Sequence, residues 1–193
     1  MKGNARLFQY IFFLICCFTL FACSDLAEEE ETAGPLGNGS GGVAASANLI
    51  TRNITKSSGE LIGTYQYDGD VFLEVFSAAS SAETVFLILN DITGSTITAT
   101  AGRIIGRPDT ACRYQAAVMA RDLDYEIEDT ALKKNAEDIE FYKVSVRKSG
   151  AYVDLYCATL SDQIGVSFII SASSVEALQF QQVFSLLNSV TLN

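Results

Sequence analysis

The feature that most limits how this chain can fold is an almost wholly apolar run, Leu7 to Phe21, which ends at Ala22 and Cys23. Lys2 and Arg6 precede it, so residues 1–22 have the basic, apolar and small-residue parts of a secretory signal. A membrane-spanning helix needs about 20 apolar residues to cross roughly 30 Å of hydrocarbon. This run is shorter and leads directly into acidic residues. A cleaved signal is therefore favoured over a retained anchor, and the folded domain is expected to begin later.

The next segment, residues 23–48, has the composition of a tether. Ser24–Asn48 contains five acidic residues and no basic one, and then becomes rich in Gly, Ser and Ala. Such a segment buries too little apolar surface to offset the entropy of ordering, so we expect it to be disordered. A flexible chain of this length has an end-to-end distance of roughly 25 to 30 Å, and repulsion within Glu28–Glu31 extends it.

Leu20, Phe21, Ala22 and Cys23 resemble the lipobox of bacterial lipoproteins. The resemblance implies cleavage before Cys23, diacylglycerol on its thiol and an acylated new amino terminus. It therefore implies an outer-membrane lipoprotein of the cell envelope, facing the periplasm or the cell surface. Phe21 departs from the pattern because it is bulkier than the usual residue. The alternative is ordinary secretory cleavage after Ala22, which gives a secreted, unanchored protein.

The acidic run Glu28–Glu31 is also similar to the export signals that follow the lipidated cysteine in some surface-exposed bacterial lipoproteins. A plain solvated linker explains the same residues.

The five cysteines divide into three groups. Cys16 and Cys17 leave with the signal, Cys23 is the expected lipidation site, and Cys112 and Cys157 remain in the domain. Two cysteines in an exported domain indicate one disulfide, which closes a loop of about 46 residues and contributes roughly 4 kcal/mol on the chain-entropy model. Two buried free thiols are the alternative.

Residues 49–193 are expected to form one α+β domain, with an antiparallel sheet of about seven strands and two helices packed against it. Asp68-Gly69 lies between two strand-like runs and predicts a hairpin. The second of these runs, Val71–Phe76, is nearly all apolar, which predicts a central strand. A second strand pair is expected at Val85–Asp91 and Ser95–Ile104, giving four antiparallel strands in the first half of the domain.

The second half is expected to contain a helix, a three-stranded meander and a closing helix. Pro108 suits the first turn of a helix, and Cys112 belongs to its apolar stripe. The meander covers residues 138–172, and Cys157 lies on the apolar face of its middle strand, so both cysteines are expected to point toward the core. The closing helix is expected to start at Ser173, with a capping box to Glu176.

From Pro108 onward, the order of helix, meander and closing helix, ending in "LLNSVTL", is similar to the PsbP and Mog1-like group, which often carries a comparable serine-containing helix end. The resemblance covers under half of the chain. It implies a non-catalytic binding or assembly role.

Composition argues against several classes of function. The chain has no histidine, so Ser-His and Cys-His arrangements and most zinc sites are absent. Its net charge of −10 argues against a nucleic-acid partner. We therefore expect no catalytic residues, no metal and no cofactor. The ligand is unknown, and the expected partners are the membrane, through the lipid anchor, and an envelope protein or polymer.

The competing hypothesis is a small hydrolase or transferase that uses carboxylates, which requires two acidic groups in one pocket with shifted pKa values.

Three local patterns have both a functional and a structural interpretation. Asp122–Asp129 alternates acidic and apolar residues, which fits a calcium loop or, better, a half-exposed strand. Gly102 and Gly106, near Arg107, fit an anion site at a helix start or a simple turn. Two tyrosine pairs could form a binding surface or pack within a sheet: Tyr65 with Tyr67, and Tyr152 with Tyr156.

Overall fold

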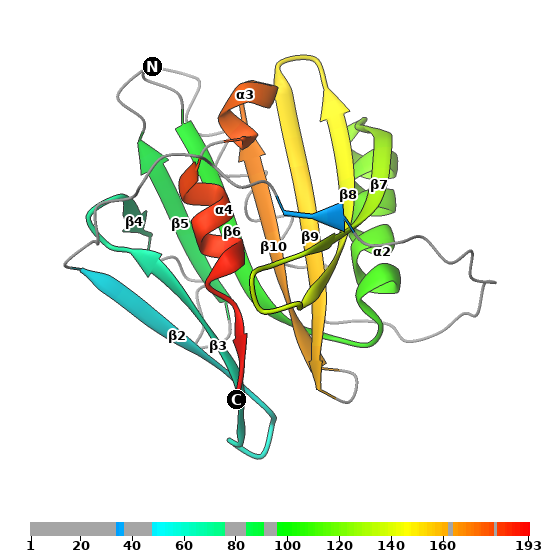
Figure 1. The fold of residues 1–193 in the computed structure, drawn as a ribbon. Helices are drawn as coiled ribbons and strands as arrows, with labels where there is room; N and C mark the ends of the chain where they lie inside the picture. The colour runs from blue at the N-terminus through cyan, green and yellow to red at the C-terminus, as the bar shows by residue number, and fades with distance from the viewer. Residues whose placement is uncertain (1–33, 37–47, 76–83, 91–95, 162–163, 180) are drawn as a thin grey trace.

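The fold is built on an eight-stranded sheet with the order β1-β7-β8-β9-β10-β6-β5-β4 (Figure 1). The computed structural model describes residues 34–36, 48–75, 84–90, 96–161, 164–179 and 181–193. Neighbouring strands of this sheet are antiparallel, except that β1 pairs with β7 in parallel. In sheet order the strands are β1 (Gly34–Pro35), β7 (Glu126–Lys134), β8 (Glu140–Lys148), β9 (Ala151–Ser161), β10 (Ile164–Ala172), β6 (Thr96–Ile105), β5 (Thr84–Asn90) and β4 (Phe72–Glu74).

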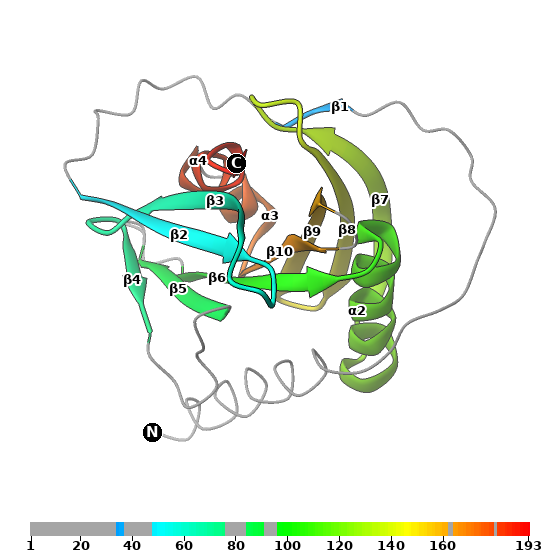
Figure 2. The same ribbon diagram turned by 90° about the horizontal axis from the view of Figure 1, so that it is seen from below.

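A second, three-stranded sheet and three helices complete the described part of the domain. The second sheet has the order β11 (Thr191–Leu192), β3 (Leu61–Asp68), β2 (Leu49–Thr55), and the helices are α2 (Pro108–Leu123), α3 (Val175–Leu178) and α4 (Gln181–Asn188). The large sheet curls around the small sheet, α3 and α4, whereas α2 lies on its outer, convex face (Figure 2). The fold is therefore α+β with mostly antiparallel sheets, as predicted.

Each face of the large sheet contributes to a separate hydrophobic cluster. The concave-side cluster lies between the two sheets, and the convex-side cluster lies between the large sheet and α2. Along β9, Val153, Leu155 and Cys157 pack with α2, whereas Tyr156 and Ala158 pack on the concave side between the two sheets. Successive residues of a strand point to opposite faces, so one strand supplies both clusters.

Helix α2 and the meander form as the sequence predicts. Pro108 is at the start of α2, and Cys112, Ala116 and Met119 are its buried residues. The helix ends at Asp124, whose left-handed conformation (φ 60°) stops the helical hydrogen bonding. Strands β8, β9 and β10 pair consecutively, and Gly150, with φ 72°, provides the turn between β8 and β9.

The predicted hairpin at Asp68-Gly69 is wrong. Strand β3 belongs to the small sheet, and β4 belongs to the large sheet, so the chain changes sheets at this turn. The Gly69 N–H donates to the carbonyl of Asn48, and the Asp70 N–H donates to the Asp68 carboxylate, which closes the turn locally. The local signal for a turn was correct, but it did not determine which strands pair.

The central position expected for Val71–Phe76 is also wrong, because β4 is an edge strand. Its pairing covers Phe72–Glu74, and Phe76 lies outside the described residues. Phe72 is buried, whereas Leu73 on the other face is 61% exposed. The apolar composition is thus explained by one face packing on the second sheet. The expected pair of strands that follows is present as β5 and β6, although the turn between them lies outside the described residues.

The closing helix differs from the expectation in its start and its continuity. Ser174, not Ser173, is the N-cap, and its hydroxyl accepts a hydrogen bond from the Ala177 N–H at 3.2 Å. The third residue after this cap is Ala177, so the capping box with Glu176 does not form. Two short helices, α3 and α4, replace the single helix.

The C-terminal end of α4 is fixed to both neighbouring layers. The Ser189 hydroxyl accepts from the Gln66 N–H and lies 2.8 Å from the Gln66 carbonyl on β3. The buried side chain of Asn135, just after β7, donates to the carbonyls of Leu187 and Val190. These contacts hold α4 between the small sheet and the β7–β8 turn.

The expectation of disorder over residues 23–48 does not hold at Gly34–Leu36. These residues lie against the edge of β7, and Leu36 is only 4% exposed within the concave-side cluster. Burial of one leucine supplies the stabilisation that the segment's composition lacks. In the part of the chain that the structure describes, no helix is long and apolar enough to cross a membrane.

Candidate functional site

A group of polar side chains lies together on the concave face of strands β8 and β9. We call it the β8–β9 charged cluster, and it consists of Lys143, Ser145, Arg147, Tyr152, Asp154 and Tyr156. The residues of β8 that alternate with it, Tyr142, Val144 and Val146, pack under α2 on the other face. The two-residue connection at Gly150 sets the register, which places Ser145 opposite Asp154.

Asp154 is the centre of this cluster and is only 1% exposed. Its carboxylate forms ion pairs with Lys143 Nζ at 3.0 Å and with Arg147 Nη2 at 2.9 Å. The Ser145 hydroxyl donates to the same carboxylate at 2.9 Å. A carboxylate offers about four acceptor positions, so these donors occupy most of its capacity. Such partners compensate a buried charge that would otherwise be strongly unfavourable.

The two cations are themselves held by their surroundings. Lys143 Nζ lies 5.8 Å from the centre of the Tyr156 ring, and the Arg147 guanidinium lies 5.7 Å from that of Tyr152. Arg147 also donates to the Val153 carbonyl at 2.8 Å. Glu128 pairs with Arg147 from β7, but its side chain is 60% exposed, so this outer pair contributes little to stability.

The arrangement does not provide a general base. Burial raises the pKa of Tyr156, and the negative charge of Asp154 raises it further, so the phenol stays protonated near neutral pH. Asp154 is the one fully buried carboxylate among the described residues, and both of its oxygens already have cationic partners. The cluster is therefore a network of two cations around one buried carboxylate rather than a pair of carboxylates with separate roles.

A second polar group joins the two sheets at the opposite edge. Tyr67 on β3 donates to Glu74 on β4 at 2.5 Å, and Arg52 on β2 forms an ion pair with the same carboxylate. The hydrogen bond with Tyr67 raises the pKa of the Arg52 guanidinium. Burial raises the pKa of Tyr67, and its hydrogen bond to Glu74 adds to this effect. We call these three residues the edge clasp.

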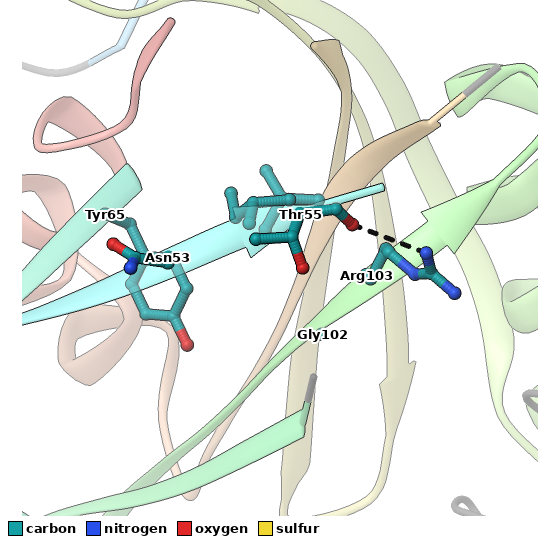
Figure 3. Close-up of a pocket in the computed structure, with 7 residues that line it drawn as sticks. Asn53, Thr55, Tyr65, Gly102 and Arg103 are labelled. Carbon is teal, nitrogen blue, oxygen red and sulfur yellow. Dashed lines mark hydrogen bonds between the residues drawn. The ribbon is translucent and has the colours of Figure 1, made fainter. Parts of the chain in front are cut away.

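A small cavity lies between the sheets, lined by Asn53, Ile54, Thr55, Tyr65, Gly102, Arg103 and Val166 (Figure 3). Its volume of about 20 Å³ is enough for roughly one water molecule. Arg103 lies at its rim and donates to the Thr55 carbonyl at 3.3 Å. This cavity is too small for an organic substrate.

The anion site considered at Gly102, Gly106 and Arg107 is not assembled. Arg103 points to the concave side, whereas the N-terminus of α2 lies on the convex side. Arg107 pairs with Asp109 at 3.3 Å. Gly106, with φ 103°, makes the turn out of β6, which is its structural interpretation.

The acidic segment Asp122–Asp129 is divided between elements. Asp122 is in the last turn of α2, Asp124 follows the helix as its cap, and Glu126–Asp129 begins β7 with exposed side chains. Within the described ranges, no group of three or more acidic or cysteine side chains could hold a metal ion. The strand interpretation therefore applies only from Glu126 onward.

The tyrosine pairs pack inside the fold and do not form an open surface. Tyr65, Tyr67 and Tyr156 are buried, and Tyr152 is half-buried beside the concave-side cluster. Tyr65 packs edge-on against Phe168, with ring centres 5.4 Å apart. Sequence reasoning placed Asp154 on the same strand face as Tyr152 and Tyr156 but gave it no role, and it missed Lys143 and Arg147. The turn at Gly150 fixes the register of β8 against β9, and this register was the signal that could have shown that these side chains lie together.

The cysteines of the domain form a disulfide. Cys112 on α2 and Cys157 on β9 are both fully buried, and their Cα atoms are 5.9 Å apart. The bond ties α2 to the middle strand of the meander across the convex-side cluster. Cys23, the predicted lipidation site, lies outside the described residues.

Neither known protein families nor curated proteins provide a match to this chain.

The charged cluster leads to a prediction for Asp154→Asn. The substitution leaves two cations near a neutral group, so we expect the free energy of unfolding to fall by about 3 to 5 kcal/mol in chemical denaturation. Glu128→Gln removes the exposed partner of Arg147 and should change it by less than about 1 kcal/mol. Equal effects of the two substitutions would contradict the central position of Asp154.

The disulfide leads to a second prediction, for the double substitution Cys112→Ala with Cys157→Ala. We expect a loss of about 2 to 5 kcal/mol in the free energy of unfolding, because the unfolded chain is no longer constrained. In the unsubstituted protein recovered from an oxidising compartment, alkylation after denaturation without reductant should label neither residue. Labelling of both would show that the thiols are free.

Proposed function

We propose that this protein is a lipoprotein of the bacterial cell envelope, anchored through Cys23, whose α+β domain is a non-catalytic binding or assembly module. The ligand of the module is an envelope protein or polymer.

The arrangement of cysteines is the observation that carries this proposal. The two cysteines of the domain are bonded to each other inside the core. Disulfides persist in oxidising compartments, which agrees with export. With Cys112 and Cys157 paired, Cys23 is left as the single unpaired cysteine after the expected signal cleavage. It follows a small residue at the end of an apolar run, where a lipobox places its acylated thiol.

The chemistry of the domain supports binding rather than catalysis. The buried carboxylate of Asp154 is paired with Lys143 and Arg147, and the cavity in Figure 3, of about 20 Å³, has room for only about one water molecule. Neither place brings two carboxylates together, as a carboxylate-based hydrolase requires. The PsbP and Mog1-like resemblance agrees with a binding role.

Replacement of the lipidation site tests the anchor. In a bacterial host that processes lipoproteins, Cys23→Ser should prevent acylation, so that protein whose leader has been cut off should no longer be found in the membrane fraction. Cys17→Ser, inside the same apolar run, is the matched control and should leave the protein membrane-bound. Mass spectrometry of the mature amino terminus should find an acylated Cys23. An unmodified Cys23 would instead support the secreted, unanchored alternative.

Retention of an envelope component tests the binding role. A tagged domain beginning at Gly34 should retain a component of envelope extracts, and an excess of the untagged domain should compete for it. If nothing is retained competitively, the binding role is wrong.

A further inference from the structure

Part of the expected tether is bound to the domain. Gly34 pairs with Lys133 and Pro35 with Lys134 at the edge of β7, and the Leu36 N–H donates to the Lys134 carbonyl at 2.8 Å. The Leu36 side chain is buried among residues of the concave-side cluster. Figure 2 shows β1 at the end of β7, where the large sheet curls toward α4.

These three residues have chemical reasons to bind at this edge. Burial of the Leu36 side chain, which is 4% exposed, removes apolar surface from water and so favours docking of a short segment. Pro35 lacks an N–H, which an edge strand tolerates and a central strand does not. The strand also covers backbone groups of Lys133 and Lys134 that would otherwise be an open sheet edge.

Charge limits how far the docked strand can extend. Continuing the parallel register toward the amino terminus would set Glu30 opposite Asp129 and Glu29 opposite Glu128. Asp129 and Glu128 are exposed on β7, and like charges directly opposite each other destabilise a strand pair. Pairing that extended as far as Glu29 and Glu30 would therefore be disfavoured.

We propose that docking of β1, which we call the strap, shortens the free part of the tether. Docking thereby fixes the distance and the orientation of the domain relative to the membrane. This inference rests on the proposed anchor at Cys23. With the strap docked, Ser24–Ala33 alone joins the lipid to the sheet, and a chain of ten residues spans at most about 36 Å. With the strap released, the 25 residues from Ser24 to Asn48 span at most about 90 Å.

The strap also determines orientation, because it attaches at one end of the sheet order. The β7 edge is held close to the bilayer, and the β4 edge, with the edge clasp, is turned away from it.

Docking is tested without any lipid, in the Cys23→Ser protein. Gly34→Cys combined with Lys133→Cys should form a new disulfide, because these residues are register partners. Gly34→Cys combined with Thr130→Cys is the matched control. Three residues along a strand amount to about 10 Å, which is too far for a disulfide. Peptide mapping distinguishes the new bond from Cys112–Cys157. Equal cross-linking of the two pairs would overturn the docked register.

The height above the membrane is tested with the lipidated protein in vesicles that contain an acceptor-labelled lipid. A donor dye on Glu137→Cys, in the exposed β7–β8 turn, reports its distance from the bilayer by energy transfer. Leu36→Asp should release the strap and lower the transfer. Leu192→Asp, at an exposed leucine, should leave it unchanged. Unchanged transfer in Leu36→Asp would overturn the strap.

A second variant tests the strap without relying on Leu36→Asp, which could unfold the whole domain. Locking the strap with the Gly34→Cys, Lys133→Cys disulfide should give the same transfer as the unlocked protein. Higher transfer after locking would show that the strap is normally undocked, and would overturn the inference. A protein that does not float with the vesicles at all indicates failure of the lipid anchor, which is a different result.

Discussion

The two-sided burial of β9 is the constraint on which the rest of the structure depends. One set of its side chains packs under α2, where Cys157 bonds to Cys112, and the alternate set faces the concave side. A strand buried on both faces cannot shift by one residue without exchanging the two sets. Cys157, in the disulfide, belongs to the set on the convex face, and Asp154 belongs to the set on the concave face. The disulfide and the ion pairs of Asp154 therefore require the same register of β9.

The side chains on the concave side therefore change from apolar to charged from one part of the sheet to the other. Toward β10 and β6 it is filled by the apolar residues that pack against β3 and α4, including Phe168 and Ile97. Toward β8 it becomes charged, and two cations rest on tyrosine rings around one carboxylate. A buried ion pair rarely adds much net stability compared with apolar packing, but breaking one is costly. This cluster therefore adds little net stability, but any register of β8 and β9 that separated Asp154 from its cations would be costly.

How much could be predicted depended on how local each signal is. Pro108 and Gly150 act through the backbone of their own turns, so α2 and the β8–β9 turn could be predicted from the sequence. The turn at Asp68-Gly69 was equally visible, but the partners of β3 and β4 are distant in sequence. Strand β2, with its alternating polar residues, was not predicted at all. The charged cluster was missed because Lys143 and Asp154 meet only once the register of the meander is known. Leu36 gave no signal because its stabilisation comes from a core that the tether does not contain.

The edge clasp of Arg52, Tyr67 and Glu74 has a mechanical consequence. At this edge the chain passes from one sheet to the other through a single short turn, and these three side chains form a polar contact between the sheets. Loss of the Glu74 carboxylate would remove this polar contact, whereas the apolar packing between the sheets, such as Tyr67 against Phe72, would remain. The disulfide, on the far side of the large sheet, ties α2 to the meander independently of this edge.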